Sequence, residues 1–386
     1  MIQEKLKKQL DLCMGCGYCR DAYGDEGWLE TLKTKHVCPV REILGFDSYT
    51  AKGRILLGKA LYEELLSYTP TVIDIFYNCT LCGNCEAHCI SRGLPFVDPD
   101  LKVREIIRFF REKIVSESLG LPERLKKLAF NVSQYGNVFG DEAPFSSTLY
   151  LKENCDSETI FFSGCMVRFR ESQIAKAVDK LTNKLSLKLG IIDNEFCCGS
   201  PLIRTGQVKA AKSIMSKNSD TLNKFKIKTL VTSCPGCFST FKNEYPKYGY
   251  QLNFDVQHIT EYLSKNSQIK NFLSNFKSIK VTYHDPCELG RLNKIYDPPR
   301  QVLQFIPNIQ LIEPFRTRIN AWCCGAGAGV QAGYPDLSKE ISNDRYNELK
   351  NTNADYIVTS CPNCLHALGK IGKIYDIIEF LNKFII

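Results

Sequence analysis

The sequence predicts a chain of the α+β class with α/β repeats. We expect a mainly helical N-terminal domain, then two tandem α/β domains related by a pseudo-twofold repeat. Three observations predict this: 19 cysteines in local groups along 386 residues, apolar residues at helical spacing near the N-terminus, and a motif that occurs twice in the C-terminal part. The expected bounds are 1–118 for the helical domain, 119–157 for a connector, and 158–278 and 279–386 for the α/β domains.

Two segments of the N-terminal domain have the apolar spacing of amphipathic helices. The first is Thr50–Ser67, and the second is Val103–Val115, with Val103, Ile106, Ile107, Phe110 and Ile114 on one face. Such a stripe is more typical of a plain core helix than of a cofactor-binding surface. The later stretch 131–159 is rich in Gly, Pro, Ser and Asn, which favours a connector.

The repeat in the C-terminal part joins strand-like runs to cysteine motifs. Val231-Thr-Ser-Cys-Pro-Gly-Cys237 is matched by Val358-Thr-Ser-Cys-Pro-Asn-Cys364, and Phe196-Cys-Cys-Gly199 is matched by Trp322-Cys-Cys-Gly325. Short β-prone runs at 160–162, 228–232, 279–283 and 355–359 lead toward the cysteines, with helical patterns between them. Alternating strands and helices predict parallel sheets, and sites in such sheets lie where the strands end.

Composition excludes several classes of protein. The chain is 44% hydrophobic and 24% charged, which excludes disorder. Its formal charge of +8 comes from scattered Lys and Arg without interleaved aromatic residues, so we expect no nucleic-acid partner. No apolar run is long enough for a direct membrane span, and the charged N-terminus lacks the core of a signal peptide. Grouped cysteines in a long chain indicate metal ligands in a reducing compartment. We therefore expect a cytoplasmic location, with any membrane contact made through a partner.

The first cysteine region has the spacing of two iron–sulfur clusters. Three cysteines at two-residue gaps wrap a turn around three corners of a [4Fe-4S] cubane, and the fourth ligand comes from elsewhere, often from the other run. We therefore expect two groups: Cys13, Cys16, Cys19 and Cys89 for one cubane, and Cys79, Cys82, Cys85 and Cys38 for the other. A pair of zinc sites is the alternative, but zinc does not explain the repeated third cysteine.

The second cysteine region offers five thiols in each repeat, one more than a cubane or a tetrahedral zinc site takes. The first repeat supplies Cys165, Cys197, Cys198, Cys234 and Cys237, and the second supplies Cys287, Cys323, Cys324, Cys361 and Cys364. Five thiols with a vicinal pair make sense if one sulfur bridges two irons of an opened cluster. Gly199 and Gly325 would bind the cofactor by letting the backbone approach the inorganic core.

These cysteine motifs resemble those of a known protein family. The first region resembles the two-cluster ferredoxin domains of respiratory and heterodisulfide reductase subunits. It departs from them because Ile90 rather than Pro follows Cys89, and because 18 residues separate Cys19 from Cys38. The two repeats resemble the CCG domains of heterodisulfide reductase, and the whole chain is similar to its fused, membrane-partnered catalytic subunit.

The resemblance implies a function and its cofactors. Each set of five cysteines would hold a non-cubane [4Fe-4S] cluster, in addition to the two cubanes, and these ten cysteines would be catalytic. The paired clusters would cleave the anionic mixed disulfide of coenzymes M and B, so the chain would be an enzyme of the heterodisulfide reductase type. Four clusters predict about 16 iron atoms per chain.

The chain has no flavin or haem motif of its own, so we expect an electron-donating partner subunit, either a membrane cytochrome b or a soluble flavoprotein. The alternative is an electron-transfer subunit of a complex that oxidises lactate, glycolate or glycerol-3-phosphate. Such a subunit would have no disulfide chemistry of its own.

Weaker signals lie beside the cysteines. His284 is the candidate catalytic proton donor, with a structural histidine that steadies the following turn as the alternative. Cations that could meet anionic substrate groups, or simply face solvent, are Arg168, Arg204, Arg291 and Lys294. The run Gly325-Ala-Gly-Ala-Gly329 lacks the spacing of a dinucleotide-binding loop, and backbone donation to cluster sulfur is the preferred interpretation. Cys155 fits no motif.

Overall fold

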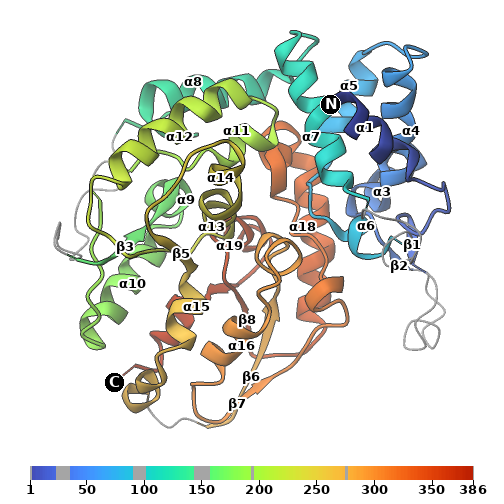
Figure 1. Cartoon of the computed structure of the whole chain (residues 1–386). Coiled ribbons are helices and arrows are strands. Elements are labelled where there is room, and N and C mark those ends of the chain that lie inside the picture. Colours follow the sequence, from blue (N-terminus) through green and yellow to red (C-terminus); the bar gives the residue numbers. More distant parts are fainter. Residues whose placement is uncertain are drawn as a thin grey trace.

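The computed structural model describes residues 2–22, 35–89, 101–142, 157–192, 195–273 and 277–385. Figure 1 shows the helical N-terminal domain, in blue to cyan, beside two α/β domains. The N-terminal elements are α1 (Ile2–Asp11), β1 (Asp21–Ala22), β2 (Lys35–His36), α3 (Pro39–Leu44), η1 (Asp47–Tyr49), α4 (Ala51–Tyr62), α5 (Pro70–Tyr77), α6 (Asn84–Ala87) and α7 (Val103–Ser116).

The two predicted N-terminal helices are present. The Thr50 side chain caps α4 by accepting from the Gly53 N–H at 3.1 Å. The predicted end of this helix at residue 67 is wrong. The chain leaves the helix after Tyr62, where Glu64 has a φ of 58° and Leu65 is 77% exposed. Helix α7 matches its predicted span, and the five apolar residues predicted on one face are all buried.

The first α/β domain has a parallel sheet in the order β3-β4-β5. Its elements are β3 (Thr159–Phe162), α9 (Gly164–Phe169), α10 (Ser172–Lys184), α11 (Ser200–Arg204), α12 (Val208–Leu222), β4 (Thr229–Thr232), α13 (Pro235–Ser239), the π-helical turn η2 (Thr240–Glu244), α14 (Tyr245–Lys247), β5 (Asp255–His258), α15 (Ile259–Ser264) and η3 (Ser267–Phe272).

The second α/β domain has a parallel sheet in the order β7-β6-β8-β9. Its elements are β6 (Ile279–His284), the π-helical turn η4 (Glu288–Leu292), α16 (Asp297–Leu303), β7 (Ile309–Leu311), η5 (Arg318–Asn320), η6 (Gly327–Gly329), α17 (Val330–Gly333), α18 (Pro335–Lys350), β8 (Tyr356–Thr359), α19 (Pro362–Gly369), β9 (Tyr375–Asp376) and α20 (Ile377–Leu381). The predicted parallel α/β content of both repeats is confirmed.

The two sheets share their strand order. Strands β3, β4 and β5 correspond to β6, β8 and β9, and a parallel bridge from Ile160 to Gly190 takes the place of the β6–β7 pairing. The helices that follow β5 and β9 both begin with a capping box, at His258 and at Asp376. Phe161 and Val231 of one sheet and Val281 and Val358 of the other lie in a single buried cluster, so the two domains share a core.

The predicted connector, 119–157, contains a helix that the sequence did not predict. Residues Glu123–Tyr135 form helix α8, whose Leu125, Leu128 and Val132 are buried. These residues recur at helical spacing, and Gly136 ends the helix with a φ of 70°. Helix α8 packs against α12 and α17, and Figure 1 shows α8 and α12 side by side. The remaining connector, 143–156, lies outside the described residues, and Cys155 lies there as well.

The glycine-rich run of the second α/β domain packs against the N-terminal domain. A β carbon on Gly327 would lie 2.4 Å from the carbonyl oxygen of Thr80. The next carbonyl, that of Ala328, accepts from Arg111 Nη1 at 3.0 Å. Gly325 donates its N–H to the Cys323 sulfur at 3.3 Å. Donation from this run to cluster sulfur stays a prediction. The glycine-rich run therefore packs against the N-terminal domain at Gly327, where the nearby backbone leaves no room for a side chain.

Gly327→Ala is expected to destabilise this junction, because the added β carbon would overlap backbone rather than a movable side chain. The cost should be about 1–3 kcal/mol, as for other overpacked sites. Thermal unfolding of the cluster-loaded chain measures it. Gly369→Ala is the matched control, since its β carbon would lie 3.8 Å from Ile374. Equal unfolding midpoints for the two variants would contradict the close packing described here.

Within the described ranges, no helix is both long enough and apolar enough to cross a membrane.

Candidate metal centres

Five cysteines of the N-terminal domain line one small cavity, and the four other than Cys85 are named the outer group. This outer group consists of Cys13, Cys16, Cys19 and Cys89. Gly15 and Gly17 have φ angles of 70° and 86°, which let the loop between α1 and β1 turn around the cavity. The Lys52 backbone N–H donates to the Cys19 sulfur at 3.2 Å, and burial raises the pKa of that thiol to about 11.

Four cysteines line a second cavity. This inner group consists of Cys38, Cys79, Cys82 and Cys85. Cys38 stands at the N-cap of α3, and the Leu81 N–H donates to the Cys79 sulfur at 3.4 Å. Cys85 also borders the first cavity, so the two groups adjoin each other. Each cavity is therefore lined by one predicted set of four cysteines, and Cys85 borders both cavities. The exchange of the fourth ligands between the two runs stays a prediction.

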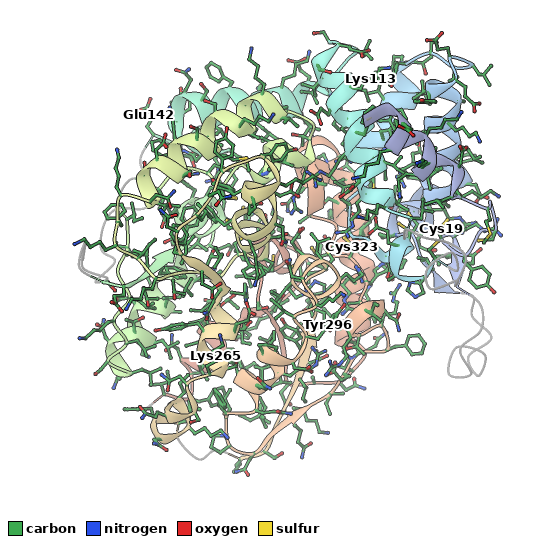
Figure 2. All side chains as sticks on the ribbon, in the orientation of Figure 1. Cys19, Lys113, Glu142, Lys265, Tyr296 and Cys323 are labelled. Atoms are coloured by element: carbon green, nitrogen blue, oxygen red, sulfur yellow. The ribbon has the colours of Figure 1, made fainter. Side chains whose placement is uncertain are left out.

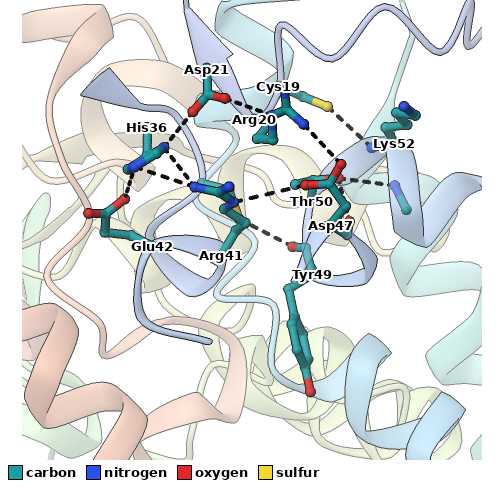
Figure 3. A network of polar contacts seen from close by, with 12 residues as sticks. Cys19, Arg20, Asp21, His36, Arg41, Glu42, Asp47, Tyr49, Thr50 and Lys52 are labelled. Carbon is teal, nitrogen blue, oxygen red and sulfur yellow. Dashed lines mark hydrogen bonds and ion pairs between the residues drawn. The ribbon is translucent and has the colours of Figure 1, made fainter. Parts of the chain in front are cut away.

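Polar contacts hold the two described ends of the segment between Cys19 and Cys38. Figure 3 shows the His36 ring between the carboxylates of Asp21 and Glu42, with a 3.0 Å contact from Nε2 to Glu42. Arg20 bonds Asp21 at 2.6 Å and reaches Asp47 at 3.2 Å. These ion pairs tie the short β1–β2 hairpin to η1, which is a structural role for His36.

The first five-cysteine site is assembled from α9, α11 and α13. Its sulfurs contact one another in the order Cys165, Cys197, Cys198, Cys237 and Cys234. Gly199, in the left-handed region at φ 92°, donates its N–H to Cys197 at 3.5 Å. A β carbon on Gly164 would lie 2.9 Å from the Cys237 sulfur, so glycine clears space beside the thiols.

The second five-cysteine site repeats this arrangement. Its sulfurs contact one another in the order Cys287, Cys323, Cys324, Cys364 and Cys361. The Cys323 sulfur also contacts the Cys82 sulfur of the inner group, and it donates to Thr80 Oγ1 at 3.5 Å. The inner group and the second five-cysteine site are therefore immediate neighbours. Figure 2 labels Cys323 near the meeting point of the domains and Cys19 farther out in the N-terminal domain.

The two five-cysteine sites also adjoin each other. Asn363, which lies between Cys361 and Cys364 of the second motif, donates from Nδ2 to the Cys234 sulfur at 3.8 Å. The four groups therefore form a series: outer group, inner group, second five-cysteine site, first five-cysteine site. All 18 motif cysteines are free thiols in the structure, and such a donor set fits iron–sulfur clusters in number and type.

His284 lies at the second five-cysteine site. Its Nδ1 accepts from Arg345 Nε at 3.0 Å, so the neutral ring carries its proton on Nε2. The ligand atoms of His284, Cys324 and Cys364 lie within 4.8 Å of one another, and burial lowers the pKa of the ring. His284 Nε2 is buried near these sulfurs but has no hydrogen-bond partner among the described residues, and a buried arginine holds the other side of the ring.

A cavity of about 670 Å³ lies between the N-terminal domain and the two α/β domains. Three of the predicted anion-binding residues line it: Arg204, Arg291 and Lys294. Arg168 does not line it and instead donates to the Glu195 carbonyl at 3.2 Å. Arg204, beside the first five-cysteine site, forms an ion pair with Glu288, which follows Cys287 of the second. Sequence reasoning missed Glu288 and the cavity, because the lining residues come from distant segments.

Comparisons with known proteins agree with this arrangement. A 4Fe-4S dicluster domain family matches residues 9–92, and the cysteine-rich CCG domain family matches twice, at 159–242 and 281–369. The chain is 32% identical over 385 residues to an uncharacterized iron-sulfur protein of Methanococcus maripaludis, with 95% of this chain and 74% of that protein covered.

A second relative carries a functional name. It is one subunit of the dihydromethanophenazine:CoB–CoM heterodisulfide reductase of Methanosarcina acetivorans, and identity is 32% over 377 residues, with 92% of this chain and 87% of the relative covered. The chain belongs to the family of this heterodisulfide reductase subunit. It is therefore an iron–sulfur oxidoreductase with a ferredoxin-type region and two CCG domains.

A further relative is named as a quinone oxidoreductase. The chain is 29% identical over 353 residues to the EtfAB:quinone oxidoreductase of Syntrophomonas wolfei. That match covers 83% of this chain but 48% of the relative, so the chain spans about half of that protein.

Proposed function

We propose that this chain reduces a disulfide at its two five-cysteine sites, with electrons supplied through the outer and inner groups. The observation that carries the proposal is the contact series itself. The two five-thiol sites adjoin where Asn363 contacts the Cys234 sulfur, and the second site contacts the inner group through Cys323 and Cys82. We further propose that the sites are related by a pseudo-twofold axis, which the shared strand order of the two sheets supports.

The donor sets fit two cubanes on four thiols each and two non-cubane clusters on five thiols each. Bound there, iron–sulfur clusters supply electrons one at a time, and two five-thiol sites together match the two-electron change that converts a disulfide and two protons into two thiols. The chain itself excludes bulk water, since eight of these ten cysteines are buried.

The cavity between the domains is the proposed substrate site. Arg204, which lines the cavity, interacts electrostatically with Cys287 and Cys198, one from each five-cysteine site, although none of the ten cysteines is among the described lining residues. Glu288 Oε1 is buried without a hydrogen-bond partner among the described residues. We propose that an anionic group of the disulfide replaces Glu288 on Arg204, while Arg291 adds a second positive charge. His284 then holds a proton on Nε2 beside the Cys324 sulfur.

The proposed electron donor is a partner subunit that contacts the outer group, either a membrane cytochrome b or a soluble flavoprotein. Cys16 is exposed, and Met14 beside it is 56% exposed, which supports electron entry at this face. The heterodisulfide reductase relative is itself one subunit of a larger enzyme.

The alternative function is electron transfer alone, within a complex whose partner performs the chemistry. The match to an EtfAB:quinone oxidoreductase favours this alternative. The presence of five thiols at both sites favours disulfide reduction, because a subunit that only transfers electrons needs no more than clusters whose irons are all fully ligated.

The experiment that separates the two functions supplies the cluster-loaded chain with reduced viologen and the coenzyme M–coenzyme B disulfide. Disulfide reduction predicts oxidation of the dye that depends on the disulfide. A chain with its full iron and acid-labile sulfide content that leaves the dye reduced would contradict the proposal and support the electron-transfer function.

A further inference from the structure

The inner group is surrounded by arginines that no carboxylate neutralises among the described residues. The first is Arg54 on α4, which is 1% exposed. It donates from Nε to the Ile75 carbonyl at 2.9 Å, and from Nη1 to the Tyr49 carbonyl. The same Nη1 lies 4.0 Å from the Cys38 sulfur. Its Nη2 is buried without a hydrogen-bond partner in the described part of the chain, so its charge is not dispersed through a full set of bonds.

The second is Arg111 on α7, which is fully buried. It donates only to backbone carbonyls within the described ranges: to Phe76 at 2.8 Å, to Cys79 at 2.6 Å, to Arg204 at 2.7 Å and to Ala328 at 3.0 Å, with a longer bond to Tyr77 at 3.2 Å. One of these acceptors belongs to a cysteine of the inner group. Carbonyl oxygens satisfy the hydrogen-bonding capacity of a guanidinium, but they leave its positive charge in place.

The third is Arg291 in η4. It donates from Nε to the Cys82 carbonyl at 2.8 Å and from Nη1 to the Ile319 carbonyl at 3.1 Å. Its nearest anionic neighbours are the sulfurs of Cys82, Cys287 and Cys323. Within the described ranges, none of the three arginines forms an ion pair with Asp or Glu. A carboxylate near the inner group, Glu86, is itself neutralised by Arg104 at 2.7 Å.

Lys52, which is partly exposed, lines the cavity of the outer group, and its charge acts on Cys13. Two other cations of this region are paired with carboxylates. Arg20 pairs with Asp21 at 2.6 Å and with Asp47 at 3.2 Å. Lys59, on the neighbouring helix, pairs with Asp11 at 2.6 Å. Each of these two charges is neutralised by a carboxylate and is partly exposed, so water and salt screen it further.

Reduction adds one negative charge to a cluster, and a nearby buried cation stabilises that charge strongly because the surroundings have a low dielectric constant. We infer that Arg54, Arg111 and Arg291 raise the reduction potential of the inner cubane above that of the outer cubane. An electron that enters at the outer group then moves inward to the position beside Cys323. This inference rests on the proposed assignment of a cubane to each group, but it does not require disulfide chemistry.

A redox titration followed by electron paramagnetic resonance tests the inference on the cluster-loaded chain without any disulfide. Arg54→Met is expected to lower the midpoint of the higher-potential cubane, so that its reduced-to-oxidised ratio at a fixed potential falls about tenfold, or about 59 mV for one electron. Arg54→Lys keeps the charge and should retain most of the wild-type value. Arg291→Met should lower the same signal.

Lys59→Met is the control, because its ammonium is already paired with Asp11, and both midpoints should stay unchanged. Iron and sulfide content is measured for each variant. The inference is overturned if Arg54→Met and Arg291→Met leave the higher midpoint unchanged or shift the lower one instead. Loss of the inner cluster from both variants would also overturn it, because the arginines would then be structural supports. A chain that fails to reduce disulfides but shows these shifts refutes only the proposed function.

Discussion

Cys323→Ala is expected to lower viologen-dependent disulfide reduction by at least ~10³-fold, the scale of loss when a catalytic group is removed. Cys323 contacts Cys287 and Cys324 of its own site and Cys82 of the inner group. Its removal therefore takes away one thiol of five and a sulfur contact between these two groups. The initial rate of dye oxidation measures the effect.

Two further variants serve as a comparison and a control for this result. Cys197→Ala removes the corresponding thiol of the first five-cysteine site and should abolish cleavage equally, although the contact between the inner group and the second site stays intact. Cys155→Ala, outside every motif, should keep the wild-type rate. Substantial disulfide reduction by Cys323→Ala or Cys197→Ala, with both cubanes present, would show that the two sites do not act as a pair.

Arg111→Met is expected to have the largest effect on stability. The guanidinium joins the N-terminal domain to both α/β domains through carbonyls at 2.6 to 3.2 Å, and a methionine would leave those carbonyls buried without donors. Each buried carbonyl that is left without a donor costs about 1–3 kcal/mol. The midpoint of thermal unfolding of the cluster-loaded chain should fall by many degrees.

The control is Arg124→Met on the exposed side of α8. Surface substitutions of this kind change stability by about 0.5 kcal/mol or less. Equal unfolding midpoints for Arg111→Met and Arg124→Met would mean that Arg111 does not hold the three domains together.

The sequence predicted local features well and distant contacts poorly. The strand-to-cysteine order is a local pattern, so β4 and β8 and the motifs that follow them could be predicted. Helix α8 was missed because the composition of its flanking residues outweighed the spacing of Leu125, Leu128 and Val132. The order of the four groups could not be predicted, because it depends on contacts such as that between Thr80 and Cys323, which are 243 residues apart.

The environments of the arginines on α7 could not be predicted from the sequence either. Helix α7 carries Arg104, Arg108 and Arg111 at nearly regular intervals, and nothing in the sequence separates them. In the structure Arg104 pairs with Glu86, Arg108 pairs with Glu244, and Arg111 is enclosed by carbonyls from three domains. Their environments depend on which distant segment packs against each turn of the helix. Tertiary packing alone decides which arginine carries an uncompensated charge.

The most direct test of disulfide reduction at paired five-cysteine sites is a single turnover. The cluster-loaded chain is reduced, freed of dye, and mixed with one equivalent of the coenzyme M–coenzyme B disulfide, while cluster absorbance and free thiols are followed together. Disulfide reduction predicts that two thiols appear for each disulfide consumed, while the clusters lose two electrons. An unchanged cluster spectrum with the disulfide intact would contradict the account.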